Sequence, residues 1–130
     1  HACFQTDEYA CFGVHNWLED PNVLVTCDSG ARPNRDFIPN RSLAAATSDV
    51  PVLGECTWPD AGWPLQSDQL PLNTHNPMAD TAAGYMKRFC LDRHDMAANI
   101  AFMDASVETV TFEDLWSLKW HARFSSTTPP

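Results

Sequence analysis

The sequence predicts an α+β fold, in which a C-terminal antiparallel β-sheet and a short amphipathic helix, both within residues 84–124, join long irregular loops. Two observations predict it. Segments 99–103 and 107–111 have the composition of short strands and lie three residues apart, which is typical of an antiparallel hairpin. Segment 111–121 carries a helix start and an apolar stripe. A chain of 130 residues can form one core but not two, so we expect a single globular domain over 1–130.

The N-terminal part is expected to hold short strands separated by loop. Segment 9–17 (YACFGVHNW) is predicted to be a strand with a break at Gly13, and segment 23–27 (VLVTC) a second strand. Residues 28–40 are rich in Gly, Pro and Asn and are expected to be loop. One or two helical turns are expected at 41–46.

Segment 50–56 (VPVLGEC) is predicted to be a strand, and Pro51 stands near its start, a position that proline tolerates. Residues 57–83 are irregular and contain several prolines. A loop of that length is usually functional or pinned by packing. We expect Trp58 and Trp63 to pin it by packing inward.

The C-terminal part is predicted to begin with a third strand at 85–91 (YMKRFCL), followed by a polar corner at 92–95. The hairpin of 99–103 and 107–111 comes next. Its tight loop begins with Asp104, whose carboxylate can bond the main chain two residues further on.

A short amphipathic helix is expected after the hairpin, from Thr111 to about His121. Thr111 is a capping residue, and two carboxylates in the first turn oppose the positive end of the helix dipole. The spacing i, i+3, i+4, i+8 places one apolar stripe against the sheet. This stripe consists of Phe112, Leu115, Trp116 and Trp120.

The chain is strongly acidic, with 17 acidic residues, 8 basic residues and a net charge of −9. The sequence has no basic patch, so nucleic acids and anionic membrane surfaces are poor partners. Calcium, or a basic face on a neighbouring subunit, suits such a surface better. No stretch approaches the ~20 apolar residues of a membrane-spanning helix. The first residues also lack the basic start and apolar middle of a signal peptide.

The cysteines are scattered without a C-x-x-C pair, so their spacing indicates neither zinc nor a redox motif. In a secreted domain they are disulfide candidates, with the pairing open and one thiol left over. In a reducing compartment they would be small buried hydrophobic residues. They are Cys3, Cys11, Cys27, Cys56 and Cys90.

The C-terminal residues resemble a known family. His94, preceded by Arg93, is followed after nine residues by Asp104 and then by Ala105, where glycine is usual. This pattern is similar to the His-X9-Asp-Gly (H-X9-DG) C-terminal signature of bacterial prepilin-like proteins. Segment 115–124 (LWSLKWHARF) resembles an extension found in one branch of that family. Weaker similarity lies at 9–21, at 50–53 and at 58–64.

The resemblance implies a non-enzymatic structural subunit similar to the major pseudopilins of type II secretion, which carry a long apolar N-terminal helix before a globular pilin-like head. That helix is absent from this chain. The implied partners are further copies or other pilin-like subunits in a filament, with membrane contact only through the missing helix. The implied location is extracellular, at the cell surface or periplasmic. Trp116 and Trp120 are expected to be structural residues of the head.

Two roles are open for His94 and Asp104, which flank the strand 99–103 on opposite sides. A histidine base oriented by a carboxylate would suit a hydrolase. No nucleophile in a recognisable setting, such as G-x-S-x-G, accompanies the pair. We therefore expect His94 to tie the corner to the sheet or hairpin, and we expect no catalytic residues.

Oxygen ligands of the kind that calcium prefers surround the same strand: Asp92, Asp95, Asn99 and Asp104. They lack the alternation of an EF-hand loop, although heads of the resembled family can hold calcium near the C-terminal sheet. No cofactor is required: we expect these side chains to be solvated turn carboxylates, and a structural calcium ion is the alternative. Asp60 and Asp68 are a weaker second candidate.

A secreted carbohydrate- or protein-binding module is the alternative function. Trp58, Trp63 and Tyr85 could form a platform, because aromatic rings stack on the apolar faces of sugars. The competing interpretation is that these rings fill a core, as tryptophans in small domains usually do.

Overall fold

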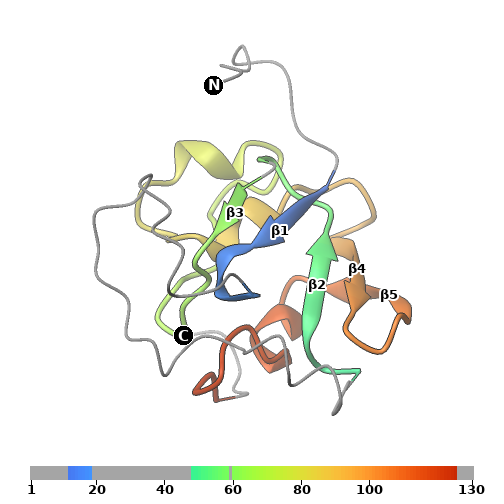
Figure 1. Ribbon diagram of the computed structural model, residues 1–130. Helices are drawn as coiled ribbons and strands as arrows, with labels where there is room; N and C mark the ends of the chain where they lie inside the picture. The colour runs from blue at the N-terminus through green and yellow to red at the C-terminus, as the bar shows by residue number, and fades with distance from the viewer. Residues whose placement is uncertain (1–11, 19–47, 59, 126–130) are drawn as a thin grey trace.

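The computed structural model describes residues 12–18, 48–58 and 60–125 (Figure 1). The elements of the described residues are short strands (β) and 3-10 helices (η). In chain order they are β1 (Gly13–His15), η1 (Asn16–Leu18), β2 (Pro51–Gly54), β3 (Asp60–Gly62), η4 (Pro77–Ala79), η5 (Met86–Phe89), β4 (Ala97–Phe102), β5 (Val107–Thr111) and η6 (Asp114–Ser117). Within the described part, no helix is long and apolar enough to cross a membrane.

The predictions for residues 19–47, which include the strand at 23–27 and the helical turns at 41–46, lie outside the described residues. The same holds for Cys3, Cys11 and Cys27. Of the strand expected over 9–17, the described part forms β1 and then turns into η1.

The strands form one sheet in the order β3-β1-β2-β4-β5. The pairs β1–β2, β2–β4 and β4–β5 are antiparallel, and β3 adds to β1 in parallel. This confirms the expected antiparallel sheet and its hairpin, since β4 and β5 pair without a bulge from Ala97↔Thr111 to Ala101↔Val107. The strand expected over 50–56 forms β2, with Pro51 as its first residue.

The strand expected over 85–91 is wrong, because residues 86–89 form the 3-10 helix η5. Its buried side chains are Met86 and Phe89, and together with the buried Cys90 that follows they stand at i, i+3 and i+4. That spacing places three side chains on one face of a helical turn, whereas a strand would have separated them onto two faces.

The helix expected after β5 is also wrong: only the single turn η6 forms, and Leu118 is extended, with φ −78° and ψ 156°. In an α-helix the carbonyl of Leu115 would accept from the N–H of Lys119. Here it accepts from the N–H of Leu118 at 3.3 Å and from Nε1 of Trp120 at 2.7 Å. The Lys119 N–H donates instead to the carbonyl of Asp49 at 2.8 Å. The predicted burial is confirmed for the whole stripe: Phe112, Leu115, Trp116 and Trp120.

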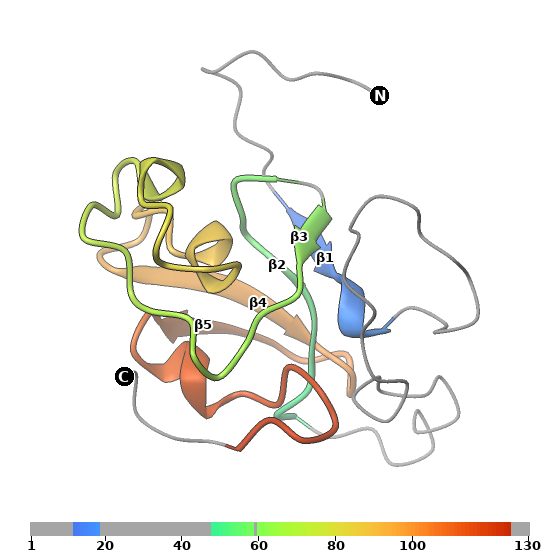
Figure 2. The same cartoon turned by 90° about the vertical axis from the view of Figure 1, so that its left-hand side faces the viewer.

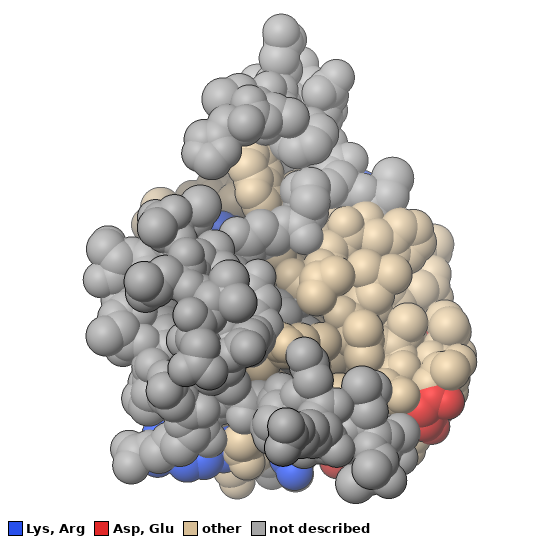
Figure 3. Space-filling model, viewed as in Figure 1, with Lys and Arg blue, Asp and Glu red and all other residues tan. Residues whose placement is uncertain are grey.

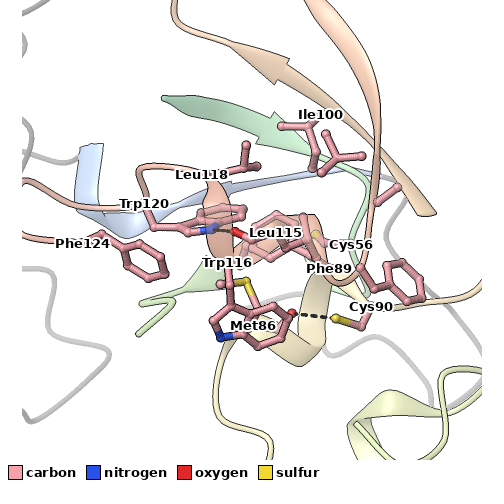
Figure 4. Packing of buried hydrophobic residues seen from close by; sticks show 14 of the residues in the cluster. Cys56, Met86, Phe89, Cys90, Ile100, Leu115, Trp116, Leu118, Trp120 and Phe124 are labelled. Carbon is pink, nitrogen blue, oxygen red and sulfur yellow. Dashed lines mark hydrogen bonds between the residues drawn. The ribbon is translucent and has the colours of Figure 1, made fainter. Parts of the chain in front are cut away.

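The core lies on the side of the sheet where η4, η5 and η6 are found (Figure 2). Figure 4 shows its packing, in which the rings of Phe89 and Trp120 lie 4.6 Å apart. Gly54 of β2 allows η5 to approach, since an added Cβ would lie 2.6 Å from Ile100 and 2.9 Å from Phe89. The buried cluster consists of Trp17, Cys56, Ala61, Trp63, Met86, Phe89, Cys90, Ala98, Ile100, Phe102, Val110, Phe112, Leu115, Trp116, Leu118, Trp120 and Phe124.

Candidate functional site

The polar corner before β4 is held by one side-chain and one main-chain acceptor. The Asp92 carboxylate accepts from the N–H of Met96 at 2.9 Å, and the Met96 carbonyl accepts from the N–H of Phe112 at 2.8 Å. Asp95 and Met96 both have positive φ, at 56° and 63°. These two left-handed residues turn the chain into β4.

His94 lies in this corner and contacts Glu55, the residue that follows β2. Its Nε2 is 3.0 Å from Oε1 of Glu55, while Oε2 of Glu55 accepts from the N–H of Asn99 at 2.8 Å. Burial alone would raise the pKa of Glu55, but the Asn99 N–H and the His94 imidazole outweigh it and lower that pKa. Glu55 therefore joins the end of β2 to the corner and to β4, which fits the expected structural role of His94.

Asp104 organises the turn at the other end of β4. Its Oδ1 accepts from the N–H of Ser106 at 2.9 Å and from the Ser106 hydroxyl at 2.6 Å. These bonds stabilise the ionised carboxylate and lower the pKa of Asp104. Ala105 has φ 70°, so the turn keeps the left-handed conformation that favours glycine although the residue is alanine.

The structure does not bring His94 and Asp104 together. The six residues of β4 separate them, and a strand of that length spans about 20 Å. The nearest cysteine in sequence, Cys90, is buried, and burial raises the pKa of its thiol far above the usual range. His94 and Asp104 therefore do not form the histidine–carboxylate pair that the hydrolase hypothesis requires.

The candidate calcium ligands are likewise spread along the length of β4. Asp92 and Asp95 lie in the corner before β4, and Asp104 lies beyond its other end. Asn99 lies between them on β4, where its Oδ1 accepts from the Thr109 hydroxyl at 2.8 Å. In residues 12–18, 48–58 and 60–125 no group of three or more His, Cys, Asp or Glu side chains is placed to hold a metal ion.

Asp68, the weaker calcium candidate, is a buried structural carboxylate. Its Oδ2 accepts from three main-chain N–H groups, those of Leu65, Tyr85 and Met86, at 2.9–3.0 Å. Gly84 lies against it with φ +67°, and an added Cβ would be 2.0 Å from Oδ1. Asp68 thus fixes the 57–83 region to the start of η5.

The two tryptophans of the loop have different environments. Trp63 is only 8% exposed and meets the Trp17 ring edge-on, with centroids 4.9 Å apart. Trp58 is 37% exposed. The prediction of inward packing is right for Trp63 and wrong for Trp58, so the two rings do not form one open platform.

The described cysteines, Cys56 and Cys90, both lie in the core, and no disulfide joins them. The Cys56 thiol donates to the carbonyl of Trp58 at 2.6 Å, and the Cys90 thiol to the carbonyl of Met86 at 3.5 Å (Figure 4). Their placement matches the buried-hydrophobe alternative rather than the disulfide prediction.

One side of the sheet faces away from the core, and we call it the outer face. A row of apolar residues crosses it. Leu53 pairs with Val14 on one side and with Ala101 on the other, and Ala101 pairs with Val107. Val107 is 68% exposed. The same side of β4 and β5 continues with uncharged residues only, namely Ala97, Asn99, Thr109 and Thr111. In Figure 3 this region is a continuous tan area, with acidic atoms only at its lower edge.

Sequence reasoning missed Glu55, and it offered Asp68 only as a calcium candidate and missed its structural role. Glu55 is the one carboxylate in the 50–56 segment, and a charge there is a signal that the strand ends at a polar partner. Asp68 carries no local signal, because its N–H partners at 85–86 come from a distant part of the chain.

Comparisons with protein-family models, curated proteins and solved structures found no match to this chain.

Proposed function

We propose that this chain is the globular head of a pilin-like or pseudopilin-like subunit in an extracellular or periplasmic filament, a structural protein that assembles through an N-terminal helix. The H-X9-DG resemblance around His94 and Asp104 suggested it. The observation that carries it is the outer face, which is apolar and uncharged across four strands.

The outer face suits a helix. Neighbouring strands lie about 4.8 Å apart, and an α-helix rises about 5.4 Å per turn. A helix lying across the strands could therefore contact Val14, Leu53, Ala101 and Val107 with about one apolar side chain per turn. Such burial favours association because it removes apolar surface from water.

The motif residues support the same function by a structural route. His94 fixes the start of β4 through Glu55, and Asp104 fixes its end through Ser106. Together they hold β4 in the register that aligns Leu53, Ala101 and Val107. We assign them no catalytic role.

The first test is the coding sequence immediately upstream of His1. A basic leader followed by ~20 apolar residues continuous with the head supports the filament proposal. A cleavable signal peptide ending just before His1 would refute it.

The second test examines assembly directly. The chain with its natural N-terminal segment is examined for filaments by negative-stain electron microscopy. Val107→Asp places a charge on the outer face and is expected to abolish assembly, while Ala122→Asp, at an exposed position after η6, is the matched control. If Val107→Asp forms filaments as abundantly as the native chain, the outer face does not take part in assembly.

No cofactor is required for this function, and structural calcium is tested separately. Melting temperatures in calcium and in EDTA are compared for the native chain and for Asp95→Asn. A calcium-dependent increase that Asp95→Asn removes would place an ion at the corner. Equal temperatures would reject it.

The alternative, a secreted carbohydrate- or protein-binding module, keeps one favourable observation: Trp58 is exposed at the surface. Glycan-array binding that Trp58→Ala abolishes would favour it. Trp63→Ala is unsuitable here because Trp63 is part of the core.

A further inference from the structure

Strand β5 has an open edge. It is the last strand of the sheet, and among the described residues only β4 pairs with it (Figure 1). Its residues, Val107–Thr111, pair with β4 in one register without a bulge. The other side of β5 therefore carries main-chain groups that no strand of the described part of the chain covers, and we call it the β5 edge.

The register identifies the main-chain groups of the β5 edge. At the end of the ladder the N–H of Phe112 donates to the carbonyl of Met96 at 2.8 Å. Hydrogen-bonded and non-hydrogen-bonded pairs alternate along an antiparallel ladder, so the even-numbered residues of β5 bond β4. Val107, Thr109 and Thr111 therefore direct their N–H groups away from β4, toward the β5 edge.

The β5 edge is also accessible. Proline, lysine and bulges are common devices that block the addition of a strand. β5 contains neither Pro nor Lys, it has no bulge, and four of its five residues are exposed, all except Val110. The sheet's other outermost strand, β3, has only three residues, and its Ala61 and Gly62 are buried. An extended segment can therefore add to the sheet at β5.

Charge selects the partner. The segment from Asp104 to Asp114 holds four acidic residues, all exposed, and no Lys or Arg; the four are Asp104, Glu108, Glu113 and Asp114. Opposite charges on neighbouring strands stabilise a sheet, and like charges destabilise it. A second copy of this chain would bring the same acidic segment and a net charge of −9. A basic strand is attracted where a second copy is repelled.

The two sides of β5 specify the side chains of that strand. Val107, Thr109 and Thr111 lie on the uncharged outer face, and Glu108 lies on the other side. Successive side chains of a strand point to opposite faces of a sheet. The added strand would therefore place Lys or Arg beside Glu108 and uncharged β-branched residues on the outer face.

We propose that the β5 edge binds an extended basic segment of another protein by strand addition. Main-chain hydrogen bonds to Val107, Thr109 and Thr111 supply the affinity, and a Lys or Arg beside Glu108 supplies the selectivity. The proposal goes beyond the filament function and does not rest on it, because binding of a peptide is measurable on the chain without filaments.

Amide hydrogen exchange, followed by NMR on the full chain, locates the contact. In the free chain the N–H groups of Val107 and Thr109 are expected to exchange rapidly, and those of Glu108 and Val110, which bond β4, slowly. A capped peptide of alternating Val and Lys is expected to slow exchange at Val107 and Thr109 at least about tenfold. Protection of both groups in the free chain, protection that rises with the concentration of the chain alone, or no effect of the peptide would each overturn the proposal.

Two further peptides separate main-chain recognition from charge in fluorescence anisotropy. A Val-Lys peptide N-methylated at alternate residues keeps its charges but loses the N–H donors of one edge, and it is expected to bind at least about tenfold more weakly. A peptide of alternating Val and Glu is expected to lose at least as much, because it brings like charges to Glu108. Equal binding of the methylated peptide would mean attraction by charge alone, and equal binding of the Val-Glu peptide would mean that the partner is not basic. Either result would overturn the proposal.

A matched pair of variants tests the edge from the side of this chain. Thr109→Pro removes an N–H of the β5 edge and no main-chain bond to β4, and it is expected to weaken binding of the Val-Lys peptide at least about tenfold. Thr109→Ala loses the same hydroxyl bond to Asn99 but keeps the N–H, so it should bind like the native chain. Melting curves show whether Thr109→Pro is folded; if it is not, the methylated peptide tests the same bonds from the partner's side. Unchanged binding by folded Thr109→Pro would overturn the proposal, whereas filaments without peptide binding would leave the filament function standing and refute only this contact.

Discussion

At Ala105 the chain holds a β-carbon in a conformation that glycine adopts more easily, with φ 70°. We expect Ala105→Gly to stabilise the fold by about 1 kcal/mol, because the left-handed region is strained for residues with a Cβ. Urea denaturation measures the change. Ala122→Gly is the control, since Ala122 is exposed and has no positive φ, and there glycine should lower the stability slightly. A lower midpoint for Ala105→Gly would contradict the turn geometry.

A single buried carboxylate, Asp68, accepts from three main-chain N–H groups. We expect Asp68→Ala to destabilise the fold by at least about 3 kcal/mol, because each unsatisfied buried donor costs about 1–3 kcal/mol. Asp80→Ala is the matched control: Asp80 also accepts from main-chain N–H groups, but these are exposed and can bond water. Thermal and urea unfolding of both variants test this. Similar losses for the two would show that burial of the Asp68 contacts is unimportant.

Among the elements, the hairpin of β4 and β5 could be predicted because its signals are local. Residues 107–111 alternate apolar and polar, and Asp104 stands where a turn carboxylate can bond Ser106. The outer face could not be predicted, because the row depends on how Leu53 pairs with Val14 and Ala101 across distant segments.

The two wrong elements failed for tertiary reasons. η5 has helical spacing at Met86, Phe89 and Cys90, but the sequence does not say which of its residues are buried. After η6 the Lys119 N–H finds the Asp49 carbonyl, and Trp120 takes the carbonyl of Leu115. Both contacts override the local preference for helix. The partners of His94 and of Asp68 were missed for the same reason.

The turn η6 should depend on the core as strongly as the expected helix would have. Trp116 is fully buried, and its Nε1 donates to the Asp68 carbonyl at 3.0 Å. Trp116→Ala is expected to cost about 3–5 kcal/mol, the usual range for removing a large core side chain. Trp116→Phe should cost less, since it keeps most of the packing and loses the hydrogen bond. An unchanged melting temperature for Trp116→Ala would mean that η6 does not pack on the core.

The link from β2 to β4 through Glu55 should depend on pH. The folded state lowers the pKa of Glu55, so its contribution is full above the unfolded pKa and is lost as pH falls through the folded one. The stability difference between the native chain and Glu55→Gln is expected to be about 1 kcal/mol at neutral pH and to shrink in acid. Denaturation at several pH values measures it, with Glu108→Gln as the exposed control. A stability difference between the native chain and Glu55→Gln that grows in acid would contradict the lowered pKa of Glu55.

For the whole molecule, charge is distributed unevenly. The outer face presents Val14, Leu53, Ala101 and Val107 in one row, and uncharged residues continue it. The rest of the chain carries its excess of acidic groups. The net charge of such a molecule opposes random association, and the outer face is the surface where apolar contact meets the least repulsion.

If copies of this chain assemble as proposed, their association should increase with ionic strength. Charges on two copies interact over about 30 Å at 0.01 M salt but over only about 8 Å at 0.15 M, so added salt weakens the repulsion that a net charge of −9 creates. Sedimentation velocity of the native chain across this range is expected to give tighter self-association as salt rises. Association that is strongest at low salt would mean that opposite charges hold the copies together, and the uncharged outer face would then not be their contact.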